Sequence, residues 1–437
     1  MPFYFVVSNK ICTFAAKSKY MEKELFRTII AENQEYIGRI PLVQRPLDLE
    51  EYGNYVFVGV RQAGKSYLLY QRIQQLLANG VDIENIVYVN FDDERLQGMS
   101  VTDFDLILQA YHSMYDSQPI FFFDEIQNVE GWANFARRLA NQKYRIYITG
   151  SNAKMLSRDI ETVLGGRYLD ISVFPYSFSE YLKAVGVLVS KNWQYGRKAN
   201  ELQRHFRIYF DWGGFPELVH FQEKRVWLNS LYNRIFFNDL VVRHKVKNED
   251  ALRLCVRRLA ESVKQPCSLN RLSNLIKATG TPCSPSTVME YVRYLQESCL
   301  LISIDNYVSK FVEKETIKKH YFVDNGLLHL FINNPNTSLL ENLCTITLYK
   351  KYGKGLYYYN RNIEVDFYVP DEGLAVQASY QMSDEETIER EAKALVTLHG
   401  LYPLKRAMII TYEDEGEIVR EGLKIEIKPA WKWVMEG

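Results

Sequence analysis

The residues from Gly59 to Ser66 read Gly-Val-Arg-Gln-Ala-Gly-Lys-Ser, which fits the pattern G-x-x-x-x-G-K-[ST] at every fixed position. Glycines let a backbone wrap closely around phosphate groups, and N–H groups at a helix start hold the anion. Lys65 would add positive charge, and Ser66 would supply a ligand for Mg²⁺. The pattern therefore predicts a nucleotide site made by Gly59, Val60, Arg61, Gln62, Ala63, Gly64, Lys65, Ser66 and Tyr67.

A pair of acids follows the apolar run from Ile120 to Phe123. Asp124 stands where it could hold Mg²⁺ through water, and Glu125 could orient and deprotonate an attacking water. Two adjacent acids after a strand are common in turns, but their position about 60 residues after a phosphate-binding loop favours the catalytic interpretation.

Two further segments carry polar groups. Thr149, Gly150, Ser151 and Asn152 end another apolar run, where they could reach the γ-phosphate or the lytic water; a turn with a capping Ser or Asn explains them equally well. Arg167 follows a glycine pair and could act as an arginine finger on the nucleotide of a neighbouring subunit, or it could be an ordinary surface arginine.

These segments require an α/β fold. Apolar strands at YVFVGV, NIVYVNF, PIFFF and RIYITG alternate with helical spacing, which predicts a parallel sheet covered by helices. The helix after the loop is expected to end at Asn79-Gly80. Met21 opens a helix-like stretch and is the expected true start, so residues 1–46 are interpreted as an extension and a helix, and residues 47–182 as the nucleotide-binding core.

At this point the chain resembles the AAA-type P-loop ATPases of archaea and bacteria whose core precedes a C-terminal region of uncharacterised role. The resemblance runs from Tyr55 to Tyr380 and rests on GVRQAGKS, FFFDEIQNVEGWANFARRL, ITGSNAKML, GGRYLDISVFPYSFSEYL, GGFPELV and EVDFYV. It implies ATP and Mg²⁺ as cofactors, with ATP binding at Gly64, Lys65 and Ser66, Mg²⁺ at Asp124, hydrolysis through Glu125, a sensor near Ser151 and Asn152, and a finger at Arg167.

The next two regions are helical. Residues 183–245 look like the helical lid of such ATPases, with aromatic stripes interpreted as core. Residues 246–312 read helix, turn, helix, strands, which is the order of a winged helix, and Ser284 or Ser286 is expected to cap the second helix. The acidic residues of this second helix argue against direct recognition of DNA bases. Nearby cations could instead meet DNA phosphates without sequence preference: Arg253, Arg257, Arg258, Lys310, Lys314, Lys318 and Lys319.

Residues 313–437 look like a restriction-endonuclease-like α/β core. In that fold the metal site combines a helix Glu, a strand Asp and an E/Q-x-K on the next strand. Glu341 and Asp366 supply the first two, with Glu364 on the same strand face as Asp366. Gln377 takes the third place, but Ser379 stands where the lysine is expected. We therefore interpret this domain as one whose cleavage is lost.

The composition excludes a global attraction to nucleic acid, because Lys+Arg and Asp+Glu both number 53. The six cysteines show no metal-binding spacing, and no apolar run is long enough to span a membrane, so a cytoplasmic protein is expected. The leading hypothesis is an ATP-hydrolysing switch or motor that moves its C-terminal domains and acts on DNA, with ATP bound at a subunit boundary of a homo-oligomer. The alternatives are a nucleotide-gated scaffold for a protein partner and an ATPase-regulated metal-dependent nuclease; a small-molecule kinase is the least favoured.

Overall fold

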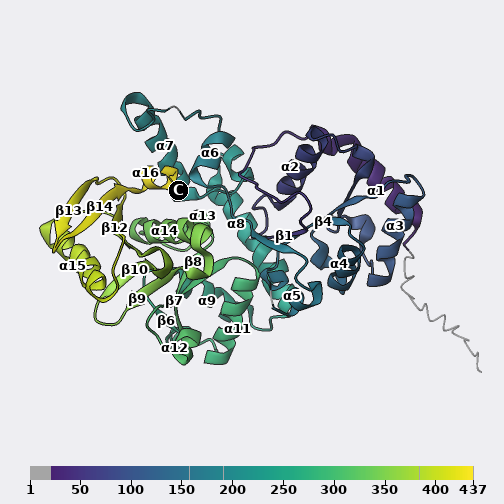
Figure 1. Ribbon diagram of the computed structural model, residues 1–437. Helices are drawn as coiled ribbons and strands as arrows, with labels where there is room; N and C mark the ends of the chain where they lie inside the picture. The colour runs from purple at the N-terminus through teal and green to yellow at the C-terminus, as the bar shows by residue number, and fades with distance from the viewer. Residues whose placement is uncertain (1–20, 157, 190, 383, 437) are drawn as a thin grey trace, which may run out of the picture.

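The computed structural model describes residues 21–436 except 157, 190 and 383. The expected extension of residues 1–20 lies outside the described residues. Two sheets lie at opposite ends of the molecule, with helices α6, α7 and α8 between them (Figure 1). The first sheet carries the glycine-rich loop and the acid pair, and the second contains Glu364 and Asp366 of the C-terminal part.

The first sheet has five strands in the order β2-β3-β4-β1-β5, and all neighbouring strands are parallel. This confirms the predicted parallel α/β core. Because β4 lies between β1 and β3, residues that follow β4 come between the phosphate-binding loop and the acid pair. The strands are β1 (Tyr55–Val58), β2 (Ile86–Asn90), β3 (Ile120–Asp124), β4 (Arg145–Gly150) and β5 (Leu169–Ser172).

Helices cover both faces of this sheet, as its continuous apolar strands require. Alternate residues of β1 point to opposite faces: Tyr55 and Phe57 join one apolar cluster with residues of α2, and Val56 and Val58 join another with residues of α1, α3 and α4. The helices are α1 (Lys23–Tyr36), α2 (Lys65–Ala78), α3 (Phe104–His112), α4 (Trp132–Asn141) and α5 (Arg158–Leu164). Asn79 ends α2 and Gly80 follows with a positive φ of 88°, as the sequence predicted.

The region after the core is helical, as predicted, and one of its segments is a π-helix. It comprises α6 (Phe178–Ala184), α7 (Gly196–Trp212), α8 (Lys224–Arg234), the π-helical segment η8 (Ile235–Val242) and α9 (Glu249–Glu261). A π-helix is rare, and π-helical turns often lie at functional sites because they redirect the side chains of a continuing helix.

Two helices and a hairpin follow α9 in the order that the sequence predicted. Ser284 caps the second helix by accepting a hydrogen bond from the backbone N–H of Thr287. The elements are β6 (Cys267–Ser268), α10 (Leu269–Lys277), α11 (Pro285–Glu297), β7 (Leu301–Asn306), α12 (Phe311–Thr316) and β8 (Ile317–Phe322). Strands β7 and β8 pair across residue 312, so a domain boundary at that residue stays a proposal.

The second sheet has nine strands in the order β13-β14-β12-β11-β10-β9-β7-β8-β6. The hairpin joins it because β7 pairs in parallel with β9. The pairing of β10 with β9 shifts register between Val365 and Tyr368, which places Asp366 within an irregularity of the strand. The strands are β9 (Tyr357–Asn360), β10 (Glu364–Val369), β11 (Leu374–Ala378), β12 (Arg406–Thr411), β13 (Gly416–Arg420) and β14 (Leu423–Pro429).

Four helices complete the C-terminal part: α13 (Asn325–His329), α14 (Asn336–Tyr352), α15 (Glu385–Leu401) and α16 (Ala430–Glu436). One apolar cluster continues from the α2 side of the first sheet through the helical region to α14 and the second sheet. The two ends of the molecule therefore share a core. In the part of the chain that the structure describes, no helix has the length and apolar character needed to cross a membrane.

Candidate nucleotide-binding site

The loop between β1 and α2 has a backbone that its glycines make possible. Gly64 has a φ of 93° at the start of α2, a region that side chains other than glycine rarely adopt. Gly59 has no room for a side chain, because a Cβ atom there would lie 1.9 Å from the carbonyl oxygen of Val173. The loop is thereby held against the residue that follows β5, with its N–H groups at the start of a 14-residue helix.

Lys65 closes over this loop and joins it to the acid pair. Its ammonium donates to the carbonyl oxygens of Gly59 and Val60, at 3.2 Å each, and to Ser151 Oγ at 2.8 Å. It also lies 3.2 Å from Glu125 Oε1. Lys65 is only 4% exposed, so this ion pair forms away from bulk water.

Glu125 is held as a carboxylate by its neighbours. It adopts a left-handed backbone (φ 52°), and its carboxylate accepts hydrogen bonds from Ser151 Oγ at 2.7 Å and from Gln127 Nε2 at 2.5 Å. Burial opposes ionisation, but the charge of Lys65 and these hydrogen bonds outweigh it and lower the pKa of Glu125 to about 2.

Asp124 is buried beside Glu125 at the end of β3. Its carboxylate accepts a hydrogen bond from Tyr88 Oη at 2.7 Å and one from the hydroxyl of Thr149, which in turn accepts the backbone N–H of Glu125 at 2.9 Å. Burial and the charge of Glu125 raise the pKa of Asp124, whereas a hydrogen bond with Ser66 lowers it. The two residues predicted to hold Mg²⁺, Ser66 and Asp124, therefore do meet.

The other two catalytic candidates are bonded to backbone groups close to them in the sequence, and their catalytic roles stay predictions. The Asn152 side chain accepts the backbone N–H of Lys154 at 2.8 Å, which closes a local turn, and the neighbouring Ser151 is the residue that reaches Lys65 and Glu125. Arg167 is exposed, and its guanidinium donates to the carbonyl oxygen of Gly165 at 3.0 Å. A role for Arg167 on a neighbouring subunit stays a prediction.

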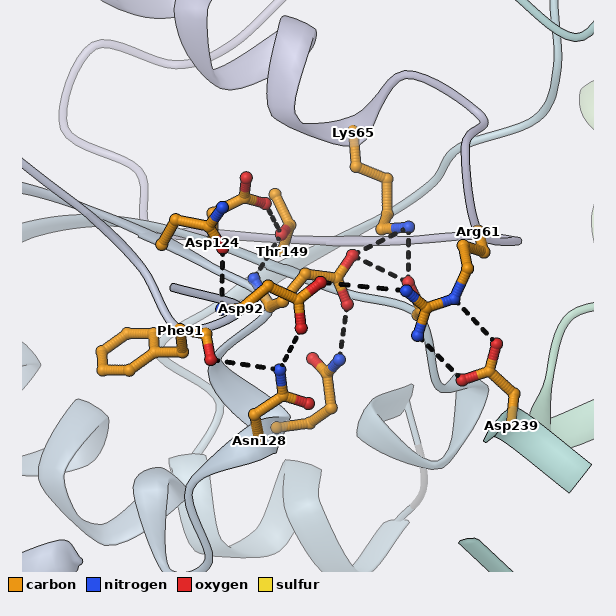
Figure 2. A network of polar contacts seen from close by, with 12 residues as sticks. Arg61, Lys65, Phe91, Asp92, Asp124, Asn128, Thr149 and Asp239 are labelled. Atoms are coloured by element: carbon orange, nitrogen blue, oxygen red, sulfur yellow. Dashed lines mark hydrogen bonds and ion pairs between the residues drawn. The ribbon is translucent and has the colours of Figure 1, made fainter. Parts of the chain in front are cut away.

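Arg61, at the third position of the loop, binds a residue that sequence reasoning missed (Figure 2). Its guanidinium makes two hydrogen bonds to Asp239 in η8, at 3.0 and 3.1 Å, and lies 3.8 Å from Asp92. Arg243 pairs with the same Asp239 carboxylate at 3.0 Å. We call this three-residue contact of Arg61, Asp239 and Arg243 the clasp.

Next to the loop is a cavity of about 280 Å³. Arg45 braces one wall: it pairs with Glu180 at 2.8 Å and donates to the carbonyl oxygen of Ala63 in the loop at 3.1 Å. The cavity is lined mainly by apolar and aromatic side chains, which suits a planar base: Pro41, Val43, Tyr67, Leu68, Tyr176 and Pro216.

The C-terminal acids also come together, around a lysine that the sequence had suggested for DNA phosphates. Lys319 on β8 is completely buried. Its ammonium lies 3.2 Å from Glu341, 3.0 Å from Glu364 and 3.1 Å from Asp366. We call these four residues the acid–lysine cluster. Burial and the nearby charge of Asp366 raise the pKa of Glu341 to about 7.

Gln377, the third member predicted for a nuclease-like site, is bonded to protein groups. Its Oε1 accepts the backbone N–H of Asp366 at 2.7 Å, and its Nε2 donates to Glu391 at 3.0 Å. Within the described residues, no group of three or more Asp, Glu, His or Cys side chains is arranged to hold a metal ion. The geometry is that of an ammonium ion surrounded by carboxylates.

A parallel sheet of order β2-β3-β4-β1-β5, a glycine-rich loop ending in Lys65 and Ser66, and an acid pair after the strand beyond β4 define a P-loop NTPase of the AAA type. A family model described as an AAA domain matches residues 52–182, and a model described as a domain of unknown function matches residues 203–338.

Two relatives are similar to this chain over most of its length. An uncharacterized protein of Methanocaldococcus jannaschii is 31% identical over 432 residues, which cover 94% of this chain and 95% of that protein. An uncharacterized protein of Haemophilus influenzae is 31% identical over 391 residues, which cover 86% of this chain and 93% of that protein. The chain belongs, with these relatives, to the AAA-domain family of P-loop ATPases.

Several solved structures are more distantly similar. A Walker-type ATPase of Pyrococcus abyssi is 12% identical with a TM-score of 0.38, covering 72% of this chain and 97% of that chain. The Orc1 protein of Aeropyrum pernix, solved in complex with DNA, is 15% identical with a TM-score of 0.31. The match covers 74% of this chain and 93% of that chain. At these values the similarity says nothing of what this chain binds.

Proposed function

We propose that this protein binds and hydrolyses ATP between the loop of residues 59–66 and the acid pair, and that the nucleotide state moves its C-terminal part. One observation carries the proposal: Lys65, Ser151 and Glu125 bind one another, and Ser66 bonds with Asp124 beside them. The residue types needed for phosphate binding, Mg²⁺ binding and water activation thus meet at one edge of the sheet.

The surrounding groups support ATP as the nucleotide. The adenine base would enter the cavity beside the loop, between Tyr67 and Pro216, and the phosphates would lie at the start of α2. Ser66 would hold Mg²⁺ directly and Asp124 through water, and the ion would neutralise charge on the phosphates. The buried, hydrogen-bonded position of Asp124 fits a ligand that acts through water.

The same contacts suggest how ATP would make Glu125 a base. Lys65 holds the Glu125 carboxylate in an ion pair and keeps its pKa low. Phosphate groups would draw Lys65 away and free the Glu125 carboxylate from its ion pair. A carboxylate that is no longer paired can accept a proton from water, so ATP binding itself would prepare the base.

The clasp supports a link from nucleotide to C-terminal part. Arg61 belongs to the phosphate-binding loop, and Asp239, which is 2% exposed, belongs to η8. His244, just after η8, stacks on Tyr294 of α11 with ring centroids 3.9 Å apart. A shift of Arg61 toward phosphate would weaken its hold on η8 and, through it, on the two-helix and hairpin region.

For the C-terminal part, we propose binding or assembly without cleavage. Lys319 already neutralises part of the charge of Glu341, Glu364 and Asp366, and Gln377 is bonded to the backbone and to Glu391. Cleavage of plasmid DNA with Mn²⁺ that disappears in Asp366→Ala would overturn this part and establish the nuclease alternative.

DNA is the proposed target, and a protein partner is the alternative. Several of the cations suggested for phosphates are engaged in the protein: Arg253 lies over the ring of Phe236 at 4.0 Å, Arg258 pairs with Glu261, and Lys318 pairs with Asp305. A homo-oligomer stays proposed because the exposed Arg167 could serve a neighbouring nucleotide site; light scattering with and without ATP measures it.

The test is ATP binding and steady-state hydrolysis by the full chain with Mg²⁺. Lys65→Ala should lose nucleotide binding, and Glu125→Gln should bind ATP but turn it over at least about 100-fold more slowly, the usual loss when a general base is removed. Glu130→Gln is the matched control, because Glu130 is exposed and lies five residues further along. Unchanged turnover in Glu125→Gln contradicts the mechanism. Binding without measurable turnover in the wild type favours the nucleotide-gated scaffold.

A further inference from the structure

A second cleft, outside the nucleotide site, lies between α7 and the ends of strands β11 and β12. Its volume is about 940 Å³. The α7 side carries three exposed arginines, Arg197, Arg204 and Arg207. Among the described residues, none of their guanidinium groups has a hydrogen-bond or ion-pair partner. They differ in this from the engaged cations of the α9 to β8 region.

The spacing of these arginines fits an extended anion. Residues seven and three positions apart fall on one side of a helix, and a rise of 1.5 Å per residue puts Arg197 and Arg207 roughly 15 Å apart along the axis. A single phosphate group cannot bridge that length. A chain of phosphates can contact all three.

The opposite wall offers aromatic rings. Tyr380 follows β11 and Tyr412 follows β12, and their rings stack with centroids 4.9 Å apart and an interplanar angle of 20°. Tyr412 also packs on Phe210 of α7 at 5.0 Å. Both tyrosines are half-buried and line the cleft. Aromatic side chains beside a basic row are how proteins hold single strands, since every base has a face that can stack.

Three acids also line the cleft, and their positions give the ligand a direction. Asp211 lies on α7 one turn beyond Arg207, and Glu413 and Asp414 follow Tyr412, whereas Arg197 and Arg204 lie further back on α7. Asp414 accepts the backbone N–H of Met382 at 2.8 Å. The carboxylates of Asp211 and Glu413 could accept hydrogen bonds from amino groups of bases, and they would repel phosphates.

We propose that this cleft binds single-stranded nucleic acid, with phosphates on the arginines of α7 and a base against the tyrosine pair. The choice of nucleic acid rests on the proposed function, but binding here requires neither ATP nor its hydrolysis. A bound nucleic-acid strand would contact α7, which belongs to the same helical region as η8 of the clasp. The nucleotide state could therefore change the affinity of the cleft for the strand.

The experiment is fluorescence anisotropy with a labelled single-stranded oligonucleotide and the matching duplex, without nucleotide, between about 50 and 200 mM salt. Replacing Arg197, Arg204 and Arg207 by Ala should weaken single-strand binding at least tenfold at the lowest salt. It should also reduce the slope of log K against log salt by about 2, since each contact with a single strand contributes about 0.7. Glu413→Gln should tighten binding, because it removes a repelling charge from the cleft while its amide oxygen can still accept a hydrogen bond.

The matched control replaces Arg137, Arg234 and Arg271, three exposed arginines outside this cleft, and should leave binding within about twofold. All six arginines are exposed, so thermal unfolding should show both variants folded. No binding at low salt, an equal loss in the control, or tighter binding to the duplex would each overturn the proposal. Lys65→Ala should bind the strand like wild type, so failure of the ATPase assignment and failure of this cleft are distinguishable.

Discussion

The clasp makes a quantitative prediction about ATP affinity. Asp239→Asn keeps the shape of the side chain and removes its charge. The Arg61–Asp239 contact has two hydrogen bonds of 3.0 and 3.1 Å, and the two side chains are 22% and 3% exposed. Hydrogen bonds to charged groups contribute about 1.5–3 kcal/mol. Because Arg61 keeps some access to water, we expect about 2 kcal/mol for the whole contact.

If phosphate must draw Arg61 away from Asp239, wild-type protein loses part of this energy when ATP binds. Asp239→Asn should then tighten ATP binding by about tenfold, since 1.4 kcal/mol corresponds to a factor of ten. Arg61→Gln should weaken ATP binding, because it removes a charge that would contact phosphate. In the Arg61→Gln background, the Asp239 substitution should have no further effect.

The assay is titration with a fluorescent ATP analogue over wild type, both single variants and the double variant. Glu426→Gln serves as a control, because it breaks an ion pair with Arg406 on the second sheet, far from the loop. Additive effects, within about 0.5 kcal/mol, would refute the reasoning, because they would mean that ATP binding does not compete with the clasp. If ATP competes with Asp239 for Arg61, ATP binding should also increase amide hydrogen exchange in η8 of the wild-type protein.

Two further outcomes follow from burial. Gly59→Ala places a Cβ atom 1.9 Å from the carbonyl oxygen of Val173, so it should lower the free energy of unfolding by about 1–3 kcal/mol and lower the unfolding temperature. Gly355→Ala is the control and should change little, because a Cβ atom there would lie in open space. Glu341 has a raised pKa, about 7 in the folded protein against about 4.5 for an ordinary glutamate. Its contribution to stability is therefore present below about pH 4.5 and lost as the pH rises through 7. The loss is of order 3 kcal/mol, and in Glu341→Gln the decline of the unfolding temperature between pH 5 and 8 should be smaller; an identical pH profile in that variant would contradict the assignment.

The local motifs were predictable because their signals are local. The apolar runs of β1, β3 and β4, the glycines of the loop and the Ser284 cap depend on neighbours within a few residues. Because strands alternate with helices along the chain, the strands are parallel, and the polar groups that follow them gather at one edge of the sheet. Even the meeting of Lys65 with Glu125 could be expected, since it is a consequence of the sheet.

Contacts between distant parts of the chain were not predictable. Arg61 and Asp239 are 178 positions apart, and no spacing in either segment marks them as partners. Lys319 reads as one of two adjacent surface lysines, but strand alternation turns it inward while Lys318 pairs with Asp305. Its burial depends on acids from α14 and β10, 22 and 47 positions away. Only the assembled sheet reveals that a lysine fills the acid cluster although Ser379 stands at the expected position.

The cations of the loop are paired with carboxylates, and we propose that ATP competes for these cations. Lys65 pairs with Glu125, and Arg61 pairs with Asp239, which also pairs with Arg243. In the proposed mechanism, phosphates displace both carboxylates, and part of the binding energy is converted into two changes. One releases the base for hydrolysis, and the other loosens η8 from the loop. A ligand shifts a conformational equilibrium only by its difference in affinity for the two states. Competition for the same two cations supplies that difference, which makes the proposed coupling of hydrolysis to movement a consequence of charge pairing at the loop.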